Sequence, residues 1–233
     1  MKSSFLTSLF DLIAPRSCAV CGHLLTRDEA ILCGGCHMQL PLTDFAAHPY
    51  DNPLARLFWG QFPIERAAAY FYFVPHSLSS RIVYLLKYGQ QPEVGEDMGG
   101  VMARTLKKND FIGDIDAVVP IPITRRRRWN RGYNQSEEIA RGIGEETGLP
   151  VLNKVVKRVR FDGSQTKKKG WERVENVESA FLLVKPEAVR GKHLLIVDDI
   201  ITTGATITAC ARELCKAGEV RVSVVSLGFT KTR

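Results

Sequence analysis

The segment from Leu194 to Thr206 constrains this chain more than any other part, because it joins an apolar run, two carboxylates and a small-residue loop. The run Leu194–Val197 is typical of a parallel strand covered on both faces. Asp198 and Asp199 follow it, and we expect them at the point where the strand ends. Apolar residues at helical spacing resume after the loop. The pattern therefore predicts a strand, a tight loop and a helix in an α/β protein.

The loop between this strand and this helix has the composition of a phosphate-binding loop. Its residues are Ile201, Thr202, Thr203, Gly204, Ala205 and Thr206. Backbone N–H groups at the start of a helix point toward an anion, and the helix dipole favours negative charge there. Gly204 allows close backbone approach, and the threonine hydroxyls add donors. Because carboxylates repel a phosphate, we expect Asp198 and Asp199 to hold ribose hydroxyls or a divalent cation instead.

Four of the six cysteines form two CxxC pairs, Cys18 with Cys21 and Cys33 with Cys36. This spacing is typical of a tetrahedral, all-thiolate zinc site, and the alternative is a set of redox-active or disulfide-bonded thiols. A closed shell of four ligands leaves no position for a substrate, which favours a structural zinc. A segment this short has little core of its own, so the metal would supply most of its folding free energy.

The composition describes a globular protein with a basic surface. The net charge is +7 and the pI is about 9.2, which suits a polyanionic partner, although a solvated basic surface gives the same values. No apolar run approaches about 18 residues, so we expect no membrane span. Asp11 interrupts the apolar start and no cleavage site follows it. We therefore expect a short amphipathic helix from Phe5 to Ile13 and a cytoplasmic protein.

Strand and helix patterns alternate along the chain and predict an open, mostly parallel sheet with flanking helices. We assign residues 1–45 to the short helix and a zinc ribbon, and residues 46–233 to the α/β domain. Residues 46–66 are predicted to be a linker with some packing aromatics. Further strands are expected at residues 68–74, 117–121 and 220–227, and helices at residues 78–86, 94–106 and 134–148. Asn134 and Glu137 have the spacing of a capping box for the last of these helices.

Residues 197–206 resemble the phosphoribosyl-pyrophosphate (PRPP) fingerprint of type I phosphoribosyltransferases. With the CxxC pairs, nearly the whole chain resembles the ComF-like branch, which joins such a domain to an N-terminal zinc ribbon. In that branch a pyrophosphate loop follows the strand at residues 117–121, and an Arg-Gly-aromatic-Asn-Gln sequence comes next. The resemblance implies that the pyrophosphate side of the substrate contacts Ile123, Thr124, Arg131, Asn134 and Gln135. A basic loop that contacts nucleic acid or only solvent is the alternative for these residues.

Three other basic segments are part of the resemblance. Lys87 fits the family at a helix end, where it reaches a phosphate or remains in solvent. The stretch from Lys154 to Trp171 corresponds to a mobile loop that closes over PRPP. Matching residues of that region are Gln165, Arg173, Asn176 and Phe181, whereas Asp162 stands where these proteins usually have a threonine. The run Arg125–Arg128 cannot point all of its side chains into one site.

The sequence favours a Mg²⁺-dependent phosphoribosyltransferase that binds PRPP or a related sugar phosphate, with Asp198 and Asp199 as the catalytic pair and an unnamed acceptor. The alternative is a non-catalytic protein that senses PRPP or a nucleotide and binds single-stranded DNA with competence proteins. ComF-like proteins are associated with DNA uptake, and arginines near Trp129 and Tyr133 fit a base-stacking surface. In a third hypothesis the ribbon serves only packing or assembly. The sequence leaves all three open.

Overall fold

The structure is a computed structural model of the chain, and it describes residues 16–159 and 180–230. The expected helix at residues 5–13 lies outside the described residues, as do Asp162, Gln165, Arg173 and Asn176. The elements in chain order are α2 (Gly34–Met38), α3 (Pro53–Leu57), β1 (Ala67–Tyr72), α4 (Leu78–Tyr88), α5 (Pro92–Lys108), β2 (Ala117–Pro120), α6 (Arg125–Arg131), α7 (Gln135–Thr147), β3 (Val156–Arg158), β4 (Phe181–Leu183), the 3-10 helix η1 (Pro186–Ala188), β5 (His193–Ile201), α9 (Ala205–Cys215) and β6 (Arg221–Phe229).

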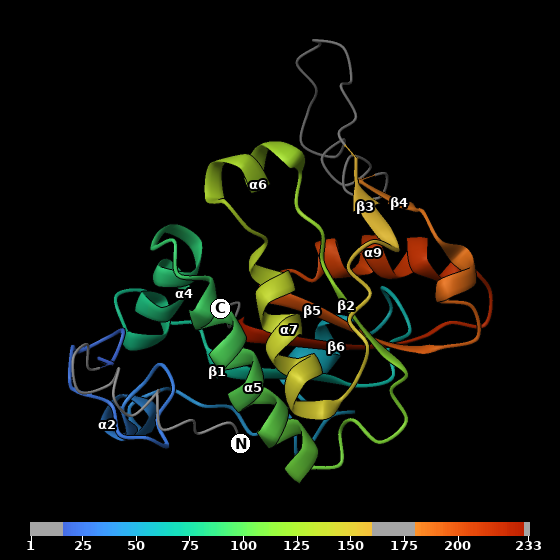
Figure 1. Cartoon of the computed structure of the whole chain (residues 1–233). Helices are drawn as coiled ribbons and strands as arrows, with labels where there is room; N and C mark the ends of the chain where they lie inside the picture. Colours follow the sequence, from blue (N-terminus) through green and yellow to red (C-terminus); the bar gives the residue numbers. More distant parts are fainter. Residues whose placement is uncertain (1–15, 160–179, 231–233) are drawn as a thin grey trace, which may run out of the picture.

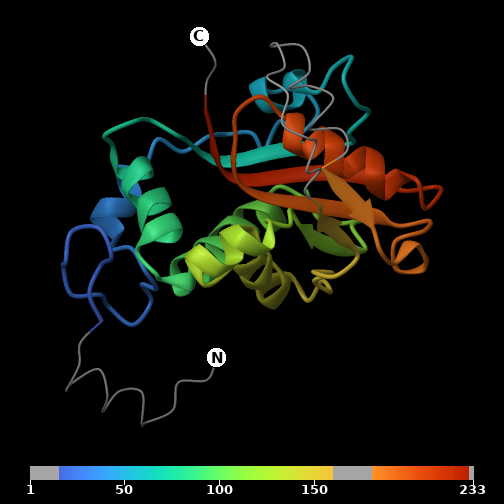
Figure 2. The same ribbon diagram turned by 90° about the horizontal axis from the view of Figure 1, so that it is seen from above.

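A four-stranded parallel sheet with the order β1-β6-β5-β2 forms the centre of the molecule. A sheet of this kind must be covered on both faces. Figures 1 and 2 show α5 and α7 against one face and α3 and α9 against the other. The short antiparallel pair β3-β4 lies apart from this sheet, next to α9. The predicted open, mostly parallel α/β sheet with flanking helices is confirmed.

β5 is longer than predicted, because it continues through both carboxylates to Ile201. Its neighbour β6 runs beside it, with Asp198 opposite Ser226 and Ile200 opposite Gly228. Backbone pairing with β6 keeps β5 extended after the apolar run has ended. Successive side chains of a strand point to opposite faces, so Asp198 and Asp199 leave the strand in different directions.

Residues 46–66 pack as part of the domain and do not form the predicted linker. The Asn52 side chain accepts from the N–H groups of Leu54 and Ala55 at the start of α3, and donates to the carbonyl of Ala67 at the start of β1. Phe58, just after α3, is fully buried. The buried residues of the cysteine segment belong to the same apolar core as the sheet. The domain boundary after residue 45 stays a prediction.

Two local predictions near the candidate site need correction. Residues 125–131, expected as a loop, form the short helix α6, because the Thr124 hydroxyl accepts from the N–H of Arg127 and caps the first turn. Asn134 caps α7 as predicted, through the N–H of Ser136. Glu137 does not complete a capping box; its carboxylate lies 2.9 Å from the guanidinium of Arg128.

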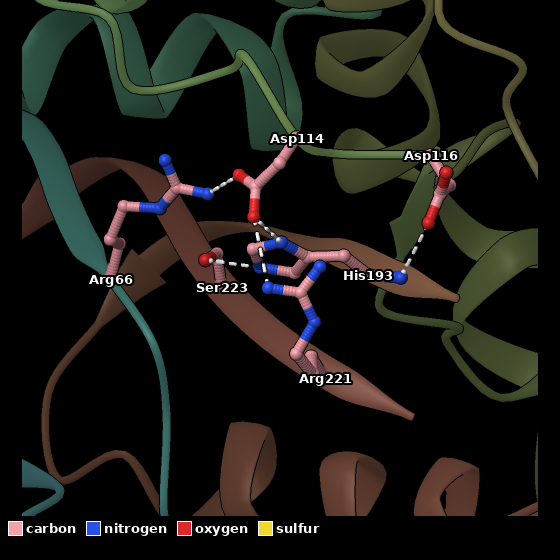
Figure 3. A network of polar contacts seen from close by, with 6 residues as sticks. All are labelled: Arg66, Asp114, Asp116, His193, Arg221 and Ser223. Carbon is pink, nitrogen blue, oxygen red and sulfur yellow. Dashed lines mark hydrogen bonds and ion pairs between the residues drawn. The ribbon is translucent and has the colours of Figure 1, made fainter. Parts of the chain in front are cut away.

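The amino ends of the four strands are joined by a polar network centred on Asp114 (Figure 3). Asp114 pairs with Arg66 before β1 and with Arg221 at the start of β6. The fully buried side chain of His193 bridges Asp114 at 3.0 Å and Ser223 at 2.8 Å. Partial burial of Asp114 opposes the ionisation of its carboxyl group. Hydrogen bonds from the two arginines and His193 outweigh this effect and hold the pKa of Asp114 well below its usual range. This network fixes the sheet at the edge opposite the two site carboxylates.

Among the helices of the described residues, none has the length and apolar character needed to cross a bilayer.

Candidate functional site

Two carboxylates at the carboxyl end of β5 form the centre of the candidate site, at the edge where open parallel sheets bind ligands. Asp198 accepts a hydrogen bond from the Ser136 hydroxyl, with an oxygen–oxygen distance of 3.0 Å. Asp199 pairs with Lys87, whose Nζ lies 3.0 Å from its carboxylate. Ser136 lies in the first turn of α7 and Lys87 in the last turn of α4. Two helices therefore converge on adjacent residues of one strand.

The environment of Asp198 opposes its ionisation. Burial, with a second contribution from the charge of Asp199, raises the pKa of Asp198 to about 7. The backbone N–H of Asp199, the Ser136 hydroxyl and the positive charge of Lys87 act in the opposite direction. Asp198 therefore titrates near neutral pH, and a cation or hydroxyl donor placed beside it would favour its ionised form.

The loop that follows β5 has the conformation expected of an anion site. Gly204 is the N-cap residue of α9 with φ of 74°, a conformation that favours glycine. A Cβ at this position would lie 2.8 Å from a ring carbon of Phe58, so the loop turns closely against the end of α3. No side chain caps the first turn of α9, and the described residues of that turn include no acid. Thr202, Thr203 and Ala205 are exposed around the uncapped N–H groups.

Arg131 and Gln135 form a linked pair at the junction of α6 and α7. A guanidinium N–H of Arg131 donates to Gln135 Oε1 at 2.8 Å. The same guanidinium lies over the ring of Tyr88, 5.8 Å from its centre. Gln135 Nε2 is buried without a hydrogen-bond partner among the described residues. The pair is thus held on the α4 side of the site.

Asn134 has a structural role. Its side chain is fully buried, donates to the Ile121 carbonyl at 3.0 Å and caps α7. Ile123 and Thr124 lie beside it in the connection from β2 to α6, half-buried. The structure pairs Lys87 with Asp199, next to Asp198 in β5, and uses the Asn134 side chain to hold the fold.

Sequence reasoning missed Ser136, the residue that donates to Asp198. The sequence contained a signal for Ser136, which lies two residues after Asn134, the N-cap of α7. In the chain, α7 comes after β2, the strand that pairs with β5. The run Arg125–Arg128 is exposed along α6, as expected of side chains that cannot all enter one site. Trp129 on the same helix is 89% exposed.

The four cysteines of the two CxxC pairs lie together, with their sulfur atoms all within 4.8 Å of one another. The Sγ atoms of Cys21 and Cys33 are 3.6 Å apart. Tetrahedral zinc with Zn–S bonds of about 2.3 Å separates its sulfur ligands by roughly 3.8 Å. The cluster could hold a zinc ion, and it is consistent with the predicted ribbon. Cys210 is fully buried in α9, where it packs in the apolar core.

The chain is similar to known proteins over most of its length. Residues 130–228 match the model of the phosphoribosyl transferase domain. The DNA utilization protein YhgH of Salmonella typhimurium is 28% identical over 210 residues, covering 89% of this chain and 87% of that protein. Competence protein F of Haemophilus influenzae is 29% identical over 223 residues, covering 91% and 85%. Competence protein ComFC of Bacillus subtilis is 30% identical over 102 residues, covering 44% and 39%.

Solved structures also match part of the chain. A glutamine PRPP amidotransferase from B. subtilis, in complex with ADP and GMP, is 22% identical with a TM-score of 0.41, covering 60% of this chain and 30% of that one. An allosteric regulatory enzyme of purine biosynthesis is 22% identical with a TM-score of 0.39, covering 58% and 25%. The match spans less than a third of either enzyme.

Proposed function

Because this chain belongs to the ComF-like family and has a phosphoribosyltransferase-type domain, we propose that it binds PRPP with Mg²⁺ and transfers the phosphoribosyl group to a nitrogen nucleophile. One observation carries the proposal: the carboxylates of β5 and the uncapped first turn of α9 meet at the same strand end. An acidic pair next to an anion site is the arrangement that a sugar phosphate requires.

Each part of the substrate has a place in this arrangement. The 5′-phosphate would bind the N–H groups and hydroxyls of the Thr202–Thr206 loop. Asp198 and Asp199 would hold the ribose 2′- and 3′-hydroxyls. Their oxygen atoms are also the donors that Mg²⁺ prefers, and the bound ion would supply positive charge to the leaving pyrophosphate. The pyrophosphate would lie toward Thr124 and Arg131.

In this proposal Lys87 forms an ion pair with either of two anionic groups. In the structure its ammonium pairs with Asp199 in a partly buried position. When ribose hydroxyls engage Asp199, the ammonium becomes free to pair with a pyrophosphate oxygen. Displacement at C1′ then depends on positioning and on stabilising the leaving group. Among the described side chains of the site, none is placed as an evident general base.

We also propose that Cys18, Cys21, Cys33 and Cys36 bind a structural zinc ion. The separation of their sulfur atoms fits tetrahedral coordination. Three of the four cysteines are buried, which suits a closed shell better than a site that exchanges ligands.

Titration calorimetry of Mg²⁺ and PRPP tests the proposed function directly. We expect binding to the wild-type protein, and at least tenfold weaker binding, about 1.4 kcal/mol, to Asp198→Asn combined with Asp199→Asn. Glu145→Gln, an exposed acid-to-amide change on α7, is the control and should bind like the wild type. Absence of binding to the wild type would overturn the proposal. If PRPP binds, the release of pyrophosphate in the presence of candidate acceptors measures turnover.

Binding of single-stranded DNA is a second candidate, and the exposed side chains of α6 favour it. Trp129 is exposed beside the arginines of the same helix. Proteins that bind single strands combine basic side chains that follow the phosphate backbone with aromatic side chains that stack on bases. The names of the relatives, which refer to competence and DNA utilization, support a role in DNA uptake. We expect the affinity for a single-stranded oligonucleotide to fall by decades as salt rises. A flat response to salt would exclude this candidate.

A further inference from the structure

A pocket of about 490 Å³ lies between the junction of α6 with α7 and the first turn of α5. Its volume falls within the range of about 300–1,000 Å³ that is usual for small-molecule sites. Trp129 and Arg131 of α6 line it, together with Glu138 and Arg141 of α7. An aromatic ring, two guanidinium groups and a carboxylate therefore face one cavity.

The pocket lies on the other side of α7 from the two carboxylates of β5. Ser136, which donates to Asp198, and Glu138 are two positions apart on this helix, about 200° around its axis. Glu138 faces α5, because a Cβ added to Gly95 would lie 2.7 Å from the Cβ of Glu138. No residue of β5 belongs to the described lining of the pocket. A ligand here would occupy a site separate from the proposed PRPP site.

Glu138 is a buried acid in the wall of this pocket, with 5% of its surface exposed. Its carboxylate pairs by charge with Arg141, but Oε2 receives no hydrogen bond from the described residues. Arg141 shares its charge with Glu96, to which it also donates at 3.0 Å. Burial raises the pKa of Glu138, and the charge of Arg141 opposes that effect. A buried carboxylate that lacks donors is costly, so a ligand that supplies N–H groups would stabilise it.

The other side chains of the pocket limit the ligand further. The Trp129 side chain is 89% exposed, and exposed aromatic side chains stack on flat rings. Arg131 donates to Gln135 with one N–H, and a guanidinium group has five, so donors remain for an anion. Arginines outnumber acids in the described lining, which favours a ligand with a net negative charge.

From these contacts we infer that the pocket binds a guanine nucleotide. The base would stack on Trp129 and donate from N1–H and the 2-amino group to the two oxygens of Glu138. Guanine carries these two donors side by side on one edge, and a carboxylate accepts such a pair in bidentate form. The phosphate would lie toward Arg131. This inference is independent of the proposed function, because the pocket shares no residue with β5 or the Gly204 loop.

Titration calorimetry with GMP and IMP tests the contact to Glu138. GMP should bind the wild-type protein at least tenfold more tightly than IMP, which lacks the 2-amino group. In Glu138→Gln the ratio of the two affinities should fall below threefold, because an amide offers a single acceptor oxygen. A ratio is insensitive to a general loss of folded protein. Glu146→Gln is the matched control, since Glu146 also joins α7 to α5 through Arg104 and Lys107 but lies outside the pocket. It should keep the wild-type ratio.

A second substitution tests the stacking contact without disturbing the core. Trp129→Ala should weaken GMP at least tenfold, and the exposure of this side chain means that the fold should be retained. Trp59→Ala removes another exposed tryptophan, outside this pocket, and should bind GMP within twofold of the wild type.

The phosphate of GMP requires a control for binding at the proposed PRPP site. Excess ribose 5-phosphate and the substitution Gly204→Ala, which both act on the Thr202–Thr206 loop, should leave GMP affinity within twofold. PRPP calorimetry on the same wild-type protein reports separately on the proposed function.

Four results would overturn the guanine site. The first is that GMP does not bind the wild-type protein, and the second is that GMP and IMP bind equally well. The third is that Glu138→Gln keeps the wild-type ratio. The fourth is that ribose 5-phosphate displaces GMP, which would place the nucleotide at the Thr202–Thr206 loop. If Trp129→Ala weakened only a single-stranded oligothymidylate and not GMP, the tryptophan would belong to a nucleic-acid surface and the guanine site would likewise fail.

Discussion

At the scale of single residues, the protonation of Asp198 controls the proposed site. The carboxylate form binds Mg²⁺ and accepts hydrogen bonds from ribose hydroxyls more strongly than the neutral acid. Burial with the Asp199 charge raises the pKa of Asp198 to about 7. We therefore expect the affinity for Mg²⁺ and PRPP to rise as the pH increases through about 7, and to fall up to tenfold per pH unit below it. The stability of the fold changes with pH in the opposite direction. Because the pKa of Asp198 is higher in the folded than in the unfolded state, the free energy of unfolding declines as the pH rises from about 4 to 7.

Ser136→Ala tests this control, because it removes a donor that favours the carboxylate. The midpoint of the affinity profile should move to higher pH, as measured by calorimetry between pH 6 and pH 8.5. Ser136→Thr keeps a hydroxyl and should keep the midpoint close to that of the wild type. An unchanged midpoint in Ser136→Ala would show that the hydroxyl does not govern Asp198.

Gly204 is the second residue whose local geometry sets the site. Gly204→Ala adds a Cβ in a positive-φ conformation and places it against Phe58, so the loop must shift. We expect PRPP affinity to fall at least tenfold. Gly218→Ala has the same kind of backbone strain, with φ of 92° and no atom within 4 Å of the added carbon. Gly218→Ala should lower the free energy of unfolding by about 1 kcal/mol and leave PRPP affinity unchanged. The pair of variants therefore separates the effect of backbone strain from the effect of a displaced Gly204 loop.

At the scale of elements, α3 supports the loop around Gly204, the proposed phosphate site, from the face opposite α7. Phe58 is fully buried at its end and contacts the loop at Gly204. Phe58→Ala should lower the free energy of unfolding by about 3–5 kcal/mol and weaken PRPP binding as well. Trp59→Ala, at a neighbouring side chain that is 62% exposed, should cost less than about 1 kcal/mol. Urea denaturation measures the free energy of unfolding of both variants. Equal losses in Phe58→Ala and Trp59→Ala would argue against this role for Phe58.

At the scale of the whole molecule, the cysteine segment and the sheet share one apolar core. His37 of α2 lies 2.6 Å from the Tyr70 hydroxyl of β1 and adds a polar link between them. Zinc removal by a chelator, or Cys36→Ser, should therefore lower the melting temperature of the entire chain. PRPP affinity per folded molecule should remain unchanged, since the cysteines lie outside the proposed site. Two separate melting transitions in calorimetry would contradict the shared core.

The sequence by itself determined the features that depend on neighbours along the chain. Apolar runs and helical spacing predicted the parallel sheet and its helices, because burial on both faces imposes these patterns directly. The CxxC spacing predicted a cluster that the structure forms, and Gly204 predicted a tight turn that it makes. Local chemistry decided these elements, so local sequence was enough.

The tertiary structure alone decided which distant side chains meet. The Ser136 hydroxyl on Asp198, Lys87 on Asp199 and Phe58 beneath Gly204 join residues from separate elements. The full length of β5 likewise depends on pairing with β6, and the packing of residues 46–66 depends on a core built by other segments. No periodicity encodes such contacts, because they arise only when helices and strands pack and their side chains compete for the same buried space.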